Sequence, residues 1–364
     1  MTGSCTHDVG TGAFDVHAHV VLEEAFGAAG PYGPELAEDA EGVPYFRIGS
    51  YSMKPMRYRG SIFMDPDRRI EAMDRDGIGR QLLSPNPLTM LHKVEARHAA
   101  GFCRAHNDAM AALVATRPDR FVGAAALPMQ DVDLALAELD RAVRELGLVA
   151  PYVGTDFGYP LDDARLDDFY RHLVELDVPL LLHPASTGGS GGPDDPRLGR
   201  FDLGILFGYA YDETLAAAAL VFGGVLDRHP SLDVCVSHGG GAIAFVADKF
   251  SFAARTRPWV PEAVREHGFE HYLRRLWFDD HVHGAAARAL VAATASPDRL
   301  VFGTNYGGWD SGGAHATSPE VAALTSNAER LLRLRTAVRA RQEPTGDAGS
   351  APPEVLPAGE PSTR

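Results

Sequence analysis

The chain has 364 residues, of which 45% are hydrophobic and 23% charged, a composition that excludes wholesale disorder. Its 34 Lys and Arg face 49 Asp and Glu, giving a formal net charge of −15. A chain this acidic repels phosphate backbones and anionic lipid surfaces, so we expect neither nucleic acid nor a membrane as a partner. Three scattered cysteines and a polar N-terminal stretch without an apolar signal region predict a cytoplasmic protein.

Short apolar runs of β type alternate along the chain with stretches of helical periodicity, such as 131–146 and 163–177. Several runs are continuously apolar, as in parallel strands buried on both faces. The eight expected strands are 13–20, 80–84, 122–127, 148–153, 178–183, 233–237, 276–279 and 300–303. Eight strands alternating with helices predict a (β/α)8 TIM barrel, with an open doubly wound sheet as the alternative.

We expect one domain over residues 1–341, interrupted by an aromatic-rich excursion at 22–65 after the first strand. A Gly-rich segment at 186–196 follows the fifth strand and lacks the GK[ST] signature of a phosphate-binding loop, which leaves an active-site loop or an idle surface loop. Residues 342–364 are rich in Pro, Gly, Ser and Glu and are predicted to form a disordered tail.

Histidines gather at the expected carboxyl ends of strands, where barrel enzymes carry out their chemistry. His17 and His19 end the first strand and, two residues apart, point to the same face. His183 ends the fifth strand, His238 the sixth, and Asn305 follows the eighth. One histidine at a strand end is more often structural, but several converging imidazoles favour a site for Zn²⁺ or a similar ion.

Four segments carry a resemblance to a known family: FDVHAHV (14–20), LLLHPAS (180–186), VCVSHGGGAIAF (234–245) and VFGTNYG (301–307). With these motifs in this order, the chain is similar to the amidohydrolase superfamily. It most resembles the branch that contains 2-amino-3-carboxymuconate-6-semialdehyde decarboxylase and the γ-resorcylate-type decarboxylases. The resemblance runs from residue 14 to residue 334.

The resemblance implies that His17, His19 and His183 bind one divalent metal, with Zn²⁺ expected. It also implies that His238 hydrogen-bonds the metal-bound water and transfers protons. The family's metal-binding Asp is replaced by Asn305, which is predicted to be a weaker, neutral ligand and which cannot accept a proton.

Two basic residues receive roles by the same resemblance. Arg57 matches an arginine that grips a substrate carboxylate, and Lys249 a basic residue that reaches the neighbouring subunit's site in a homodimer. A solvated loop arginine and an exposed helix lysine remain the alternatives.

Three functions are open at this point. The first is a metal-dependent, non-oxidative decarboxylase of a small aromatic or unsaturated carboxylic acid. The second is a metal-dependent hydrolase or hydratase that uses the same histidines on an ester, lactone or amide. The third is a catalytically silent barrel whose metal site has degraded, for which Asn305 is the main support.

Overall fold

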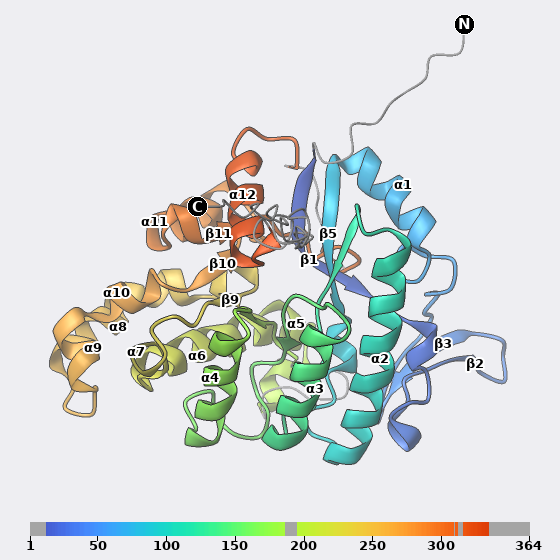
Figure 1. The fold of residues 1–364 in the computed structure, drawn as a ribbon, viewed down its shortest axis with the longest axis horizontal. Helices are drawn as coiled ribbons and strands as arrows, with labels where there is room; N and C mark the ends of the chain where they lie inside the picture. Colours follow the sequence, from blue (N-terminus) through green and yellow to red (C-terminus); the bar gives the residue numbers. More distant parts are fainter. Residues whose placement is uncertain (1–11, 186–194, 309, 312–315, 335–364) are drawn as a thin grey trace, which may run out of the picture.

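A computed structural model describes residues 12–185, 195–308, 310–311 and 316–334 (Figure 1). The parallel strands are β1 (Ala13–Val20), β5 (Ile78–Pro85), β6 (Phe121–Gly123), β7 (Tyr152–Val153), β8 (Leu180–Leu182), β9 (Val234–Val236), β10 (Trp277–Asp279) and β11 (Leu300–Val301). The helices are α1 (Pro66–Asp76), α2 (Ala96–Thr116), α3 (Val132–Arg144), α4 (Asp167–Glu175), α5 (Leu203–Leu206), α6 (Gly208–Phe222), α7 (Val225–Arg228), α8 (Ile243–Thr256), α9 (Glu262–His267), α10 (Phe269–Leu273), α11 (Ala285–Thr294) and α12 (Val321–Leu331).

The eight strands close into a ring. One ladder joins β1, β5 and β6, and a second runs from β7 through β8, β9 and β10 to β11. Isolated parallel bridges between Ala18 and Tyr306 and between Ala125 and Pro151 connect the two ladders at both seams. The predicted (β/α)8 barrel is therefore confirmed, and the open doubly wound sheet is excluded.

The expected strands and helices are present. Strand β1 has the expected bounds and β5 is longer than expected, whereas most of the other elements have shorter regular cores. Helix α3 begins where Asp131 caps it by accepting a hydrogen bond from the Leu134 backbone N. The helix expected from residue 163 starts with a 3₁₀ turn, Ala164–Leu166, before α4 begins at Asp167. This first turn is capped by the Asp163 side chain, which accepts from the Arg165 N.

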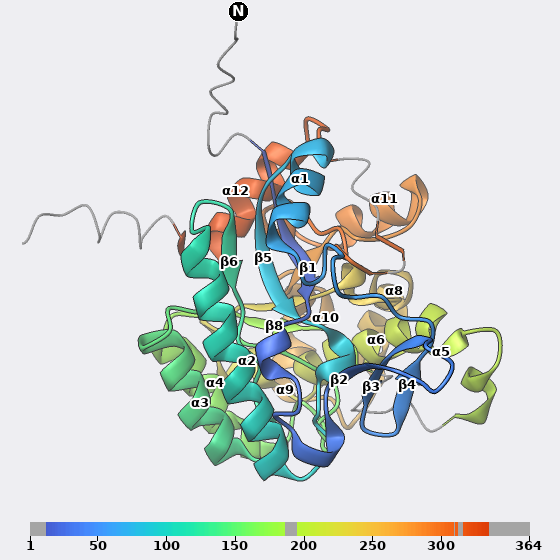
Figure 2. The same cartoon turned by 90° about the vertical axis from the view of Figure 1, so that its right-hand side faces the viewer.

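The excursion after the first strand forms a small antiparallel sheet of β2 (Glu35–Glu38), β3 (Pro44–Ile48) and β4 (Tyr51–Met53). Figure 2 shows β3, β4 and α5 on the same side of the molecule. Phe46 and Ile48 of β3 are fully buried in a core cluster with Val21 and Phe102, so this small sheet packs against the rest of the protein. Most of the Gly-rich segment 186–196 and all of 342–364 lie outside the described residues.

Among the described residues, one helical stretch of 20 residues, Leu203–Phe222 in α5 and α6, has the length and composition of a membrane span, with a mean hydropathy of 1.3 over its best 18-residue window. Core helices of globular proteins meet the same criterion. Here α6 buries Ala217, Leu220 and Val221 in the core that surrounds the barrel. Its apolar character therefore has a packing reason.

Candidate metal centre

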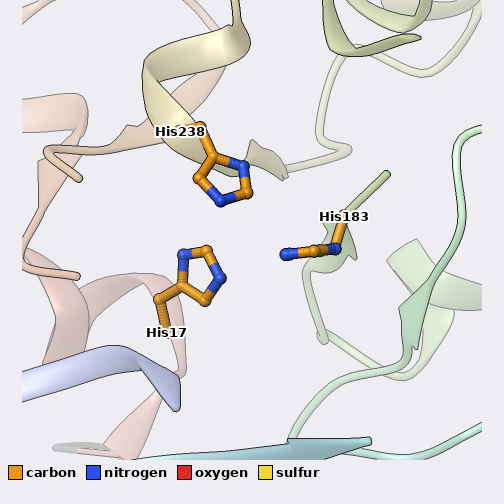
Figure 3. Close-up of side chains that lie close together, drawn as sticks. All are labelled: His17, His183 and His238. Atoms are coloured by element: carbon orange, nitrogen blue, oxygen red, sulfur yellow. The ribbon is translucent and has the colours of Figure 1, made fainter. Parts of the chain in front are cut away.

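Four imidazole rings converge inside one end of the barrel. The ring centroid of His17 lies 5.0 Å from the centroid of His19, 5.0 Å from that of His183 and 4.8 Å from that of His238. The His183 and His238 rings are 5.0 Å apart. Figure 3 shows His17, His183 and His238 facing a common point, and one nitrogen of each lies within 4.8 Å of the others. The structure thus brings together all four strand-end histidines.

The alternation of strand β8 explains why His183 points inward. Leu181 packs with Cys235 and Trp277 in the barrel interior, whereas Leu180 and Leu182 join the outer core between strands and helices. Successive side chains of a strand point to opposite faces. His183, two residues after Leu181, therefore shares its inward face.

The ring nitrogens of the three predicted ligands are arranged for metal binding. His17 Nδ1 donates to Asp279 Oδ2 at 2.7 Å, and His183 Nδ1 donates to the Pro184 carbonyl at 2.7 Å. His19 Nδ1 lies 3.1 Å from Ser84 Oγ. These bonds orient each ring so that Nε2 faces the centre, and the Nε2 atoms of His17 and His19 are 3.3 Å apart.

His183 Nε2 supplies the sharpest test of whether these residues fit a metal. It is buried and has no hydrogen-bond partner among the described residues, a state that is unfavourable for a polar nitrogen. Burial, with the neighbouring His19 and His17, also lowers the pKa of His183 well below its ordinary value. A neutral ring with an unpaired lone pair in a cluster of imidazoles is what a divalent metal requires. The donor set fits.

The glycines after His238 place this residue beside helix α6. His238 and the next three residues are left-handed, with φ of 48° at His238 and 66° at Gly241. A Cβ on Gly241 would lie 2.2 Å from the Ala210 carbonyl oxygen, so only glycine allows the turn to pack this closely against α6. The HGGG motif therefore has a steric origin.

Glu213 of α6 is the main functional residue that the sequence analysis missed. It is fully buried, and its Oε1 lies 2.7 Å from His238 Nδ1. Burial, together with Asp279 and Asp212, raises the pKa of Glu213 well above its ordinary value. Burial also lowers the pKa of His238, against the opposing effect of Asp279 and Asp310. The raised pKa of Glu213 and the lowered pKa of His238 both favour a neutral pair. In this pair Glu213 donates a hydrogen bond to His238 Nδ1, and His238 carries its own proton on Nε2.

Asp279 orients one of the four histidines. It is buried at the end of β10, and besides His17 it accepts a hydrogen bond from the His281 backbone N at 3.1 Å. Burial raises the pKa of Asp279, while His238 and His281 act in the opposite direction. Its direct contribution is to orient His17.

His19, His183 and His238 line a cavity of about 460 Å³, which is within the usual range for small-molecule sites. Among the described residues that line it, none is Lys or Arg, and the acidic ones are Glu213 and Asp310. The hydrophobic and aromatic lining comes from four parts of the chain. The excursion provides Tyr51, Met53, Met56, Tyr58 and Phe63, the α5–α6 region provides Ile205, Leu206 and Tyr209, the segment after β5 provides Pro87 and Leu88, and the segment after β10 provides Val282.

Asn305 lies on the cavity wall in a left-handed conformation with φ of 51°, which asparagine tolerates well. Its Nδ2 donates to Asp310 Oδ1 at 2.6 Å. Burial alone would raise the pKa of Asp310, but hydrogen bonds from His281 and His283 outweigh it and hold the pKa well below its ordinary value. A carboxylate therefore stands beside Asn305, supplied from five residues further along the chain.

The two predicted basic residues are not brought to the histidines. Arg57 is exposed and is absent from the described lining, although its neighbour Tyr58 is buried there. Arg59 is paired with Glu23 at 2.7 Å on the surface. Lys249 is exposed on α8, also away from the cavity lining. Their roles in substrate binding stay predictions, without support from this geometry.

A parallel barrel with an imidazole cluster at the strand ends defines the class of metal-dependent barrel hydrolases and lyases. Residues 14–340 match the sequence profile of the amidohydrolase family, and the chain belongs to this family. The family expected from the sequence is thereby confirmed.

Among its relatives, the 2-amino-3-carboxymuconate-6-semialdehyde decarboxylase of Dictyostelium discoideum is 30% identical over 243 residues, which cover 66% of each chain. The gamma-resorcylate decarboxylase of a Polaromonas species is 34% identical over 254 residues, covering 66% of this chain and 76% of that protein. The crystal structure of Metarhizium anisopliae IDCase in apo form superposes with a TM-score of 0.74 at 21% identity, over 90% of this chain and 98% of that one. This last likeness shows the fold.

Proposed function

We propose that the protein is a metal-dependent, non-oxidative decarboxylase of a small aromatic carboxylic acid. The observation that carries the proposal is the convergence of four imidazoles, each held by a partner on Nδ1, at the floor of an apolar cavity. The relatives named above are decarboxylases that share the family, which supports the same reaction class here.

The assignment of roles follows from the hydrogen bonds. His17, His19 and His183 would hold a divalent ion, which supplies positive charge that stabilises anionic oxygens of the acid. His238 faces the same space with a proton on Nε2, because Glu213 donates to its Nδ1. As the bond between the ring carbon and the carboxylate breaks, CO2 leaves and the electron pair stays on the carbon, which takes up the His238 proton. The Glu213 proton moves to Nδ1 as Nε2 releases its own, so the imidazole remains neutral. Glu213 is left as a carboxylate, and a proton from water restores the pair before the next turnover.

The lining indicates the chemistry of the substrate. Aromatic and thioether side chains such as Tyr51, Met53, Met56 and Phe63 suit the faces of a planar ring. Since the described lining has no Lys or Arg, the carboxylate would find its positive charge at the ion rather than at a guanidinium. We therefore propose an aromatic acid with few further charges.

We propose Zn²⁺ as the ion. Three neutral imidazoles with an open fourth position are a donor set typical of catalytic zinc, and softer or harder ions prefer other ligands. Loading the metal-free protein with Zn²⁺ or Mn²⁺ in parallel and comparing turnover tests this proposal, and a preference for Mn²⁺ at equal occupancy would refute it.

The decarboxylase proposal is tested by incubating the metal-loaded full chain with a panel of hydroxybenzoic acids that begins with 2,6-dihydroxybenzoate. We expect CO2 release in step with loss of the acid and formation of the corresponding phenol. His238→Ala should abolish turnover and leave the metal bound. A second panel of esters, lactones and amides tests the alternative: water incorporation without CO2 release would establish a hydrolase or hydratase. No turnover on either panel by fully loaded protein would support the silent barrel.

We also propose a homodimer formed through α8. Phe245 and Phe252 are 82% and 63% exposed, and Lys249 lies between them at a spacing that places all three on one helix face. A partner copy would cover this face and bring Lys249 to the contact. Light scattering should give twice the monomer mass for the wild type and the monomer mass for Phe252→Glu. Leu290→Glu, a charge on the exposed α11, serves as the matched control and should remain dimeric.

We propose a cytoplasmic location as well. Cys103 and Cys235 are free and buried, consistent with a reducing compartment. Recovery of the protein in the periplasmic or secreted fraction of its native host would refute this location.

A further inference from the structure

A second cluster of potential ligands lies in the same cavity as the four histidines. His281 and His283 follow strand β10, and Asp310 follows strand β11. Asp310 Oδ2 lies 2.9 Å from His283 Nε2 and 3.4 Å from His281 Nε2, and one atom from each residue lies within 4.8 Å of the others. The function proposed above makes no use of this cluster.

The spacing of these atoms suits a tetrahedral ion. Two ligands bound at about 2.0–2.1 Å with tetrahedral angles are separated by roughly 3.4 Å. The separation between Asp310 Oδ2 and His281 Nε2, 3.4 Å, equals that value, and the separation between Asp310 Oδ2 and His283 Nε2, 2.9 Å, is about 0.5 Å shorter. Two imidazole nitrogens and one carboxylate oxygen form a known zinc donor set with a position left open to the cavity.

Asp310 is oriented for this role from its other side. Asn305 Nδ2 donates to Asp310 Oδ1 at 2.6 Å, so Oδ2 is the oxygen turned toward the two histidines. Partners of this kind, which hold a ligand without touching the ion, are a regular part of metal sites. An aspartate was expected at position 305. The amide of Asn305 can donate a hydrogen bond to Asp310, which an ionised aspartate could not do.

The second cluster is tied to the first by a shared carboxylate. Asp279 accepts from His17 Nδ1 with one oxygen and from the His281 backbone N with the other. The His281 ring centroid lies 5.8 Å from that of His17 and 5.6 Å from that of His238. A ligand bound at the first cluster would therefore lie next to the second.

We propose that His281, His283 and Asp310 form a second divalent-cation site that takes Zn²⁺ or an ion of similar preference. The site supplies positive charge to a part of the cavity whose described lining contains no Lys or Arg. Resting on the proposed function, we further infer that it binds an oxygen substituent of the acid other than the one held at the first cluster.

Zinc stoichiometry tests the site. Metal-free full-length protein is dialysed to equilibrium against a fixed free Zn²⁺ concentration, and the bound metal is measured by mass spectrometry. We expect His283→Ala and Asp310→Asn each to bind one Zn²⁺ fewer per chain than the wild type. His283 is 71% exposed, so its removal leaves the fold intact, which thermal unfolding checks.

A matched control addresses metal bound to surface histidines in general. His172 lies outside the cavity and also contacts carboxylates, with Nε2 3.3 Å from Asp140 and Nδ1 3.2 Å from Glu175, but these atoms do not converge on one point. His172→Ala should therefore bind as much Zn²⁺ as the wild type. Equal stoichiometry for the wild type and His283→Ala would overturn the proposal. CO2 release measured on the same samples separates the outcomes: a second bound ion without decarboxylation refutes the proposed function alone, and decarboxylation with a single ion refutes the second site alone.

Discussion

Replacing Glu213 with glutamine should disable proton transfer by His238 without disturbing the metal. In the wild type, the buried acid donates to His238 Nδ1 and can release its proton to that nitrogen when Nε2 gives up its own. A glutamine can donate to Nδ1 in the same place but cannot release a proton. The His238 ring could then act as an acid only after it has become an imidazolium, which its burial disfavours.

The expected magnitude follows from this loss. A positioned general acid contributes about 10²–10⁴-fold to the rate. Because glutamine preserves the orientation of the ring, we expect the low end, about a 100-fold fall in kcat, or about 2.7 kcal/mol. KM should change little, since the acid acts through His238. The residual activity should rise toward lower pH, where imidazolium becomes available.

The assay is steady-state CO2 release as a function of pH on the best acid of the panel, with metal content measured on each sample. Asp212→Asn is the control: it makes the corresponding change one residue earlier, at a carboxyl group whose pKa burial raises to about 6. Asp212 contributes to the raised pKa of Glu213 but makes no hydrogen bond to His238 among those seen in the described residues, so this variant can shift the pH profile and should keep kcat near the wild-type value. Glu213→Gln should unfold at the same or a higher temperature than the wild type, because burial already holds this acid in its neutral form. Wild-type kcat and an unchanged pH profile in Glu213→Gln would refute the reasoning.

Three further predictions concern the metal and pH. Removing the metal with a chelator should abolish turnover. It should also lower the unfolding free energy by about 2.7 kcal/mol relative to protein in free Zn²⁺ at 100 times its dissociation constant, and adding Zn²⁺ back should restore both. Full activity after complete removal of the metal would contradict this. Asn305→Asp should bind metal at the first cluster about tenfold more tightly, or about 1.4 kcal/mol, in a chelator competition, and an unchanged affinity would place residue 305 outside the ligand shell. His106 is buried, and burial lowers its pKa to about 4. Between about pH 6.5 and 4 the unfolded chain therefore binds a proton at this residue that the folded chain does not bind. As a result, the unfolding free energy falls as the pH is lowered through this window. In His106→Leu, denaturant titrations should show that fall reduced by about 3 kcal/mol, whereas an unchanged pH dependence would mean that His106 contributes nothing to it.

The strand-end histidines could be predicted because two simple rules place them. The twofold alternation of a strand and the common edge of parallel strands in a barrel bring His17, His19 and His183 to one point, whatever the details of packing. The order of the eight strands followed from the same alternation of apolar runs and helices. Here local pattern and tertiary structure agree, so the sequence carries the information.

Glu213 could not be found in this way. It lies within an apolar helix with no motif around it, and its approach to His238 depends on Gly241 packing against the Ala210 backbone, a contact between residues 31 positions apart. Arg57 shows the converse. Its sequence position suggested a role in the cavity, but the packing of the excursion turns Tyr58 inward and leaves Arg57 exposed. In both cases tertiary packing, rather than local periodicity, decides which side chain reaches the cavity.

The replacement of the expected acid by Asn305 and the arrival of Asp310 are parts of one local arrangement. Asn305 and Gly307 are both left-handed, and the Gly308 backbone N donates to the Asn305 carbonyl, so the chain turns back and sets Asp310 against the Asn305 amide. The sequence at position 305 suggests that a carboxylate has been lost from the cavity. The structure shows that the Asp310 carboxylate lies within hydrogen-bond distance of Asn305. A silent barrel would require the donor set to have decayed. Instead, the rings of His17, His183 and His238 each keep a partner 2.7 Å from Nδ1. His183 Nε2 stays buried with no hydrogen-bond partner in the part of the chain that the structure describes, a state that costs the folded protein free energy.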